Sequence, residues 1–106
     1  MLLAEHIYQL TSRLPSDERY GLTAQMRRSA VSIPSNLAEG YGRNLTGSFL
    51  QFLRIAQGSL RELETQVALS VRLKFLPPES IQQSRETATT IGKLLRALIR
   101  SLENRK

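Results

Sequence analysis

Residues that could carry out acid–base or metal chemistry are few and scattered. His6 is the only histidine and the chain has no cysteine, so thiolate metal sites and cysteine nucleophiles are excluded. A di-iron site in a helical bundle needs Glu-x-x-His on two helices, which one histidine cannot supply. Glu62 and Glu64 lie two residues apart on a predicted helix and therefore point in different directions. The sequence predicts no catalytic residue, no metal site and no cofactor.

A glycine-rich segment, Gly40-Tyr41-Gly42, partly matches a phosphate-binding loop. The dinucleotide-binding pattern needs a third glycine where Leu45 stands, and it needs a preceding strand, which the pattern here does not predict. We interpret the segment as the end of a helix followed by a turn. Glu39, just before it, is expected to cap that helix or pair with an arginine rather than act as an acid or base.

The basic residues show a clearer pattern than the acidic ones. Fifteen Lys and Arg residues exceed nine Asp and Glu, giving a net charge of +6, and the arginine fork suits phosphate or carboxylate oxygens. Spacings of seven and eleven residues place three arginines on one helical face, and a second set shares one arc of the last predicted helix. These stripes could follow a phosphate backbone. The candidate nucleic-acid-binding residues are Arg27, Arg28, Arg54, Arg61, Arg72, Arg85, Lys93, Arg96 and Arg100.

Two other interpretations of the basic stripes stay open. Each stripe could be a solvated helix face with glutamate partners, or it could dock an acidic protein. Few aromatic residues are available for base stacking, so any nucleic acid, RNA or DNA, is expected to be bound through its backbone. A membrane role ranks last, because the leucines of the last helix are needed for a core.

The elements that must position these residues are helices. Apolar residues recur every three or four positions in each of four segments. Proline and glycine separate them: Pro15 ends the first segment, the second spans 22–39, the third spans 48–74, and Pro77-Pro78 begins the fourth. Residues 1–106 are therefore predicted to form one all-α domain, an antiparallel up-down four-helix bundle. Pro34 is expected to kink or break the second helix.

The third predicted helix has more apolar surface than a small bundle needs. Its main stripe runs from Phe49 to Val71, and a second patch lies well away from it. We interpret this patch as an interface between subunits, with a wider buried face inside the monomer as the alternative. The candidate interface residues are Ile55, Leu69, Leu73 and Leu76.

The chain starts without a basic signal-peptide region and has no apolar run of about 20 residues, so a cytoplasmic location without membrane association is expected.

Two stretches, residues 20–43 and 52–66, carry a family resemblance. The segment Ser-Ile-Pro-Ser-Asn-Leu-Ala-Glu-Gly, in which Pro34, Ser35, Asn36, Glu39 and Gly40 are candidate structural residues, is its most specific part. The chain closely resembles the bacterial four-helix bundle proteins of the ribosomal RNA intervening-sequence family, encoded in insertions within large-subunit ribosomal RNA genes and elsewhere. Its start is shorter than in typical members.

The resemblance implies an antiparallel bundle that assembles as a homopentamer and has no enzymatic activity. The accessory variability proteins of diversity-generating retroelements are similar in fold, and these basic pentamers bind a reverse transcriptase and nucleic acid. We therefore expect a non-enzymatic oligomer that associates with RNA, DNA or a reverse-transcriptase-like nucleoprotein. The alternative is a protein-interaction scaffold that docks an acidic protein and does not bind nucleic acid.

Overall fold

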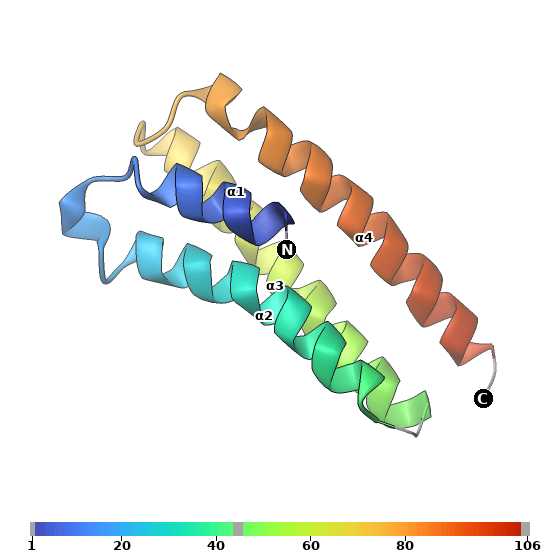
Figure 1. Cartoon of the computed structure of the whole chain (residues 1–106). Coiled ribbons are helices and arrows are strands. Elements are labelled where there is room, and N and C mark those ends of the chain that lie inside the picture. Colours follow the sequence, from blue (N-terminus) through green and yellow to red (C-terminus); the bar gives the residue numbers. More distant parts are fainter. Residues whose placement is uncertain (1, 44–45, 105–106) are drawn as a thin grey trace.

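The structure, a computed structural model, describes residues 2–43 and 46–104. Most of these residues lie in helices (Figure 1). Two short 3-10 helices accompany four α-helices in these residues. In chain order the elements are α1 (Leu2–Thr11), η1 (Ser16–Glu18), α2 (Leu22–Tyr41), α3 (Thr46–Arg72), η2 (Pro78–Ile81) and α4 (Gln82–Glu103). The predicted all-α bundle is confirmed. The fourth helix begins later than predicted, because Pro78–Ile81 forms a 3-10 turn first.

Each helix packs against the next one along the chain, and α1 also packs against α4. Figure 1 shows consecutive helices running in opposite directions, with α1 in front, between α2 and α4. The helices differ in length, with 10 residues in α1 against 20 in α2 and 22 in α4. At about 1.5 Å per residue, α1 is therefore about half as long as each of these two neighbours.

The core is aliphatic and follows the predicted stripes. On α3, Leu53, Ala56, Leu60 and Leu63 are almost completely buried, and Met26 of α2 is fully buried against them. A fully buried leucine contributes about 1.5–3 kcal/mol relative to an exposed one. The four- and three-residue spacing of these side chains keeps them on one face of the helix, so the sequence pattern identified the core of α3.

The end of α3 explains why one predicted interface residue is in the core instead. Lys74 adopts a left-handed conformation (φ 64°), and the amide of Phe75 donates to the carbonyl of Ser70, the hydrogen-bond pattern of a Schellman motif. The chain therefore turns before position 76. Leu76 is 2% exposed, and the prediction that it belongs to an exposed interface is wrong.

Pro34 does not break the second helix, since α2 continues from Leu22 to Tyr41. Its ring nitrogen carries no proton, so it donates no hydrogen bond to the Ala30 carbonyl. The Asn36 side chain donates to the carbonyl and hydroxyl oxygens of Ser32, at 2.8 and 2.9 Å. The Ser32 hydroxyl also hydrogen-bonds that of Ser59, at 2.8 Å. The central polar residues of the family segment therefore link α2 to α3.

Candidate nucleic-acid interface

An ion pair near one end of the bundle joins one side of α3 to one side of α4. The guanidinium of Arg54 donates to the carboxylate of Glu103. Seven and eighteen residues are close to whole numbers of helical turns. Arg61 and Arg72 therefore lie on the side of α3 that carries Arg54, and Arg96 and Arg85 lie on the side of α4 that carries Glu103.

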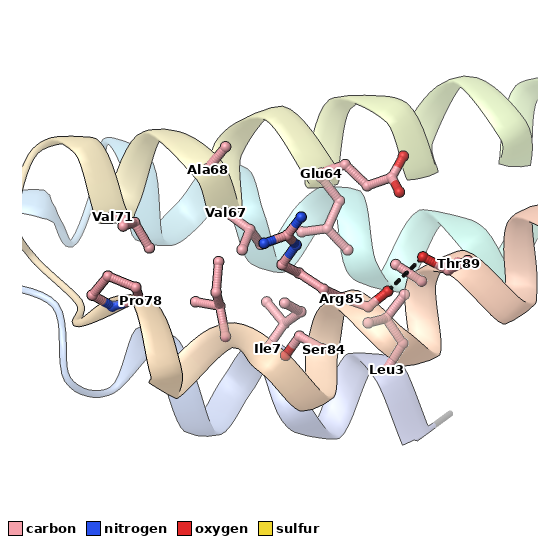
Figure 2. A pocket seen from close by; sticks show the side chains of 13 residues that line it. Leu3, Ile7, Glu64, Val67, Ala68, Val71, Pro78, Ser84, Arg85 and Thr89 are labelled. Carbon is pink, nitrogen blue, oxygen red and sulfur yellow. Dashed lines mark hydrogen bonds between the residues drawn. The ribbon is translucent and has the colours of Figure 1, made fainter.

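Other contacts also bring these sides of α3 and α4 together. A side chain added at Gly92 would meet Arg96 of α4 at 3.4 Å and Leu60 of α3 at 3.5 Å, which places the 60–61 and 92–96 segments side by side. Ala68 and Arg85 line one cavity of about 400 Å³. In Figure 2, Arg85 reaches from α4 across this cavity toward α3. Two arginines from each helix therefore share one side of the bundle.

We call Arg61, Arg72, Arg85 and Arg96 the α3–α4 basic seam. All four are exposed, and among the described residues none of them lies within 4.0 Å of a carboxylate oxygen. Lys93 and Arg100 extend the seam on α4, three residues before and four residues after Arg96, and they are exposed as well. The seam brings basic residues of two helices to one side of the bundle, and the acidic Glu64 lines the same cavity as Arg85.

Three predicted basic residues do not belong to the seam. Arg54 is paired with Glu103. Arg28 is exposed on α2 and lines a small polar depression between α2 and α3 together with Glu62. Arg27 is half-buried: its Nε donates to the Thr11 hydroxyl at 2.8 Å, and its guanidinium lies over the Tyr8 ring, 4.5 Å from the centroid. The environments of Arg54 and Arg27 indicate structural roles.

Replacing Arg27 by alanine is expected to lower the free energy of unfolding by about 1–2 kcal/mol, because it removes a partly buried hydrogen bond and a cation–π interaction between α1 and α2. Urea denaturation measures this change. RNA affinity, measured on the same variant, should change by about twofold at most, since one charge far from the seam is removed. A variant with unchanged stability and sharply weaker RNA binding would show instead that Arg27 contacts RNA.

The predicted oligomer patch keeps three of its four residues at the surface. Ile55, Leu69 and Leu73 of α3 are 44%, 42% and 50% exposed. Ile55 lies fourteen residues, or about 21 Å, from Leu69, and exposed Glu62 falls between them. The assignment of these three to a subunit interface stays a prediction.

The other three candidate structural residues of the family segment, Ser35, Glu39 and Gly40, lie in different environments. Ser35 is exposed, and Glu39 forms an exposed ion pair with Arg43 at 3.0 Å, as expected for a surface carboxylate. Gly40 is buried beneath Phe49 and Phe52 of α3. Within residues 2–43 and 46–104, no group of three or more Asp, Glu or His side chains is placed to hold a metal ion.

Comparison with known proteins decides the family. The model of the family "23S rRNA-intervening sequence protein" matches residues 1–97. The chain belongs to this family. Its fold is similar to the 1.70 Å crystal structure of a protein of unknown function from the S23 ribosomal protein family of Bacteroides thetaiotaomicron VPI-5482, with a TM-score of 0.84 and 26% sequence identity over 92% of this chain and 88% of that one.

The family assignment confirms the resemblance seen in the segment around Pro34. None of the curated protein sequences is significantly similar to this chain, and neither match names an enzyme. No helix in the described part of the chain is both long enough and apolar enough to cross a membrane.

Proposed function

We propose that this member of the family is a non-enzymatic, cytoplasmic binding protein that associates with RNA through the α3–α4 basic seam. The observation that carries the proposal is that Arg61 and Arg72 of α3 and Arg85 and Arg96 of α4 lie on the sides of the two helices that the Arg54–Glu103 ion pair joins. Like charges on neighbouring helices repel each other and do not stabilise the bundle. A polyanion that lies along the seam would neutralise them.

The chemistry of the seam suits a phosphate backbone better than individual bases. Arginine forks bind phosphate oxygens through two parallel hydrogen bonds, while the most exposed tyrosines, Tyr20 and Tyr41, lie on α2 or just before it. Binding would therefore depend little on sequence and strongly on salt. Assembly into a ring would present several seams to one RNA and raise the overall affinity.

The test combines light scattering with an RNA titration across a salt series. The purified protein should have the mass of an oligomer, with five subunits expected, and it should gain RNA mass at about 50 mM salt. The logarithm of the binding constant should fall by about 0.7 per phosphate contact for each tenfold rise in salt. DNA of the same length and a reverse-transcriptase-like protein are further candidate ligands for the same assay.

Two outcomes would contradict the proposal. An oligomer that binds no RNA even at low salt would favour the alternative, a scaffold that docks an acidic protein, and a pull-down insensitive to nuclease would then identify the partner. A monomer would contradict the oligomeric part of the proposal and the assignment of Ile55, Leu69 and Leu73 to an interface.

A further inference from the structure

The cavity of about 400 Å³ that Arg85 crosses is walled by α1, α3, η2 and α4. Its buried lining residues come from all of these elements, among them Ile7 of α1, Val67 of α3 and Ala88 of α4. Its exposed lining residues, by contrast, belong only to α3, η2 and α4. The cavity therefore opens between α3 and the η2–α4 segment, and α1 closes its inner side.

Small side chains of α4 leave this space unfilled. Ser84 and Ala88 occupy successive core positions of the helix and are buried, whereas the later core positions of α4 hold Leu95, Ile99 and Leu102. Protein interiors are normally close-packed, with few voids larger than a water molecule. A volume of about 400 Å³ lies in the range of small-molecule sites, about 300–1,000 Å³.

The cavity is long, and its walls are mainly apolar. On α3 the lining extends from Leu63 to Val71, about 12 Å along the helix axis, which is the length of an extended chain of about ten carbon atoms. All lining residues are apolar except Glu64, Ser84, Arg85 and Thr89. An unbranched hydrocarbon chain in the cavity would remove these apolar walls from water.

One charged group, Arg85, reaches over the opening. In Figure 2 its guanidinium lies between α4 and α3, and the Glu64 carboxylate at the same opening points away from it. Within the described residues, no carboxylate oxygen lies within 4.0 Å of this guanidinium. An arginine fork can bind a carboxylate through two parallel hydrogen bonds. A ligand with an apolar chain and a terminal carboxylate would match both the walls and the opening.

We propose that the cavity binds an amphipathic monocarboxylate of the medium-chain fatty acid class. The hydrocarbon chain lies between Val67 of α3 and Ala88 of α4, and the carboxylate accepts hydrogen bonds from the Arg85 guanidinium. Arg85 also belongs to the basic seam, but the proposal does not rest on RNA binding. Its test contains no RNA, so the two proposals can fail independently.

The test is isothermal titration calorimetry of the full chain with sodium decanoate, below the concentration at which decanoate forms micelles. Saturable binding of one decanoate per chain is expected. Decyltrimethylammonium has the same hydrocarbon chain and the opposite charge, and it should bind at least about tenfold more weakly. Acetate has the carboxylate without the chain and should show no saturable binding in the same range. Absence of decanoate binding, or equal binding of the two ten-carbon ligands, would overturn the proposal.

Two variants that remove the same charge locate the carboxylate. Arg85→Gln changes the residue over the cavity, and Arg19→Gln changes an exposed arginine between η1 and α2 that does not line it. Only Arg85→Gln should weaken decanoate binding, by about tenfold or more, because hydrogen bonds to a charged group are lost. Equal effects of the two variants would show that net charge alone attracts decanoate, and would overturn the proposal.

A third variant, Ser84→Leu, locates the hydrocarbon chain. The added side chain would fill part of the cavity, so saturable decanoate binding should be lost and the melting temperature should rise. Circular dichroism checks that the variant is folded. If it is not, the comparison of Arg85→Gln with Arg19→Gln still decides. Decanoate binding that is unchanged in a folded Ser84→Leu variant would place the ligand outside the cavity and overturn the proposal.

Discussion

Reversing the charge of Arg61 and Arg96 together, as Arg61→Glu with Arg96→Glu, is expected to weaken RNA binding by at least about tenfold at low salt. These residues lie on the sides of α3 and α4 that the Arg54–Glu103 ion pair joins, so one strand of RNA could contact both. The double variant replaces two attractive charges by two repulsive ones. The salt dependence should also become shallower, by about 0.7 for each phosphate that the variant no longer neutralises.

The control keeps the net charge constant and changes its position. Arg13 and Arg19 are exposed and lie between α1 and α2, so Arg13→Glu with Arg19→Glu gives the same total charge as the seam variant. If RNA binding depends on the seam, the control should bind several times more tightly than the seam variant. Equal losses for both would show that overall charge, rather than the arrangement on α3 and α4, drives binding.

The helices and their buried faces could be predicted from the sequence because they depend on the spacing of nearby residues. Spacings of three and four residues place Leu53, Leu60 and Leu63 on one face whatever the rest of the chain does, and all three are buried. The boundary of α3 was missed at its C-terminal end for a local reason as well. Lys74 adopts the left-handed conformation that turns the chain. Glycine usually occupies such a position, so a lysine there does not indicate the end of a helix.

The partners of the arginines could not be predicted, because they are distant in sequence. Arg54 meets Glu103 across forty-nine residues, and Arg27 meets Thr11 across sixteen. Helical periodicity shows which residues share a face of one helix, but it contains no information on the register between helices. The seam could be recognised only from the contacts between α3 and α4.

Gly40→Leu is expected to lower the free energy of unfolding by about 2 kcal/mol or more, because it would overpack the contact between α2 and α3. A Cβ atom at this position would lie 2.8 Å from Cδ1 of Phe49 and 3.2 Å from Cβ of Phe52. The Phe49 ring cannot move freely, since it also packs on the Tyr41 ring with centroids 4.9 Å apart. The gain in helix propensity on replacing glycine, about 0.8 kcal/mol, is smaller than this cost.

Gly58, in the middle of α3, gives the matched comparison. A Cβ atom there would have no neighbour within 4 Å, so Gly58→Leu should raise stability by about 0.5–1 kcal/mol through helix propensity alone. Thermal denaturation should therefore shift the two variants in opposite directions, by about 4–8 °C for each kcal/mol. If both became more stable, the end of α2 would have to yield to the added side chain, and close packing against Phe49 would no longer explain the glycine in this segment of the family.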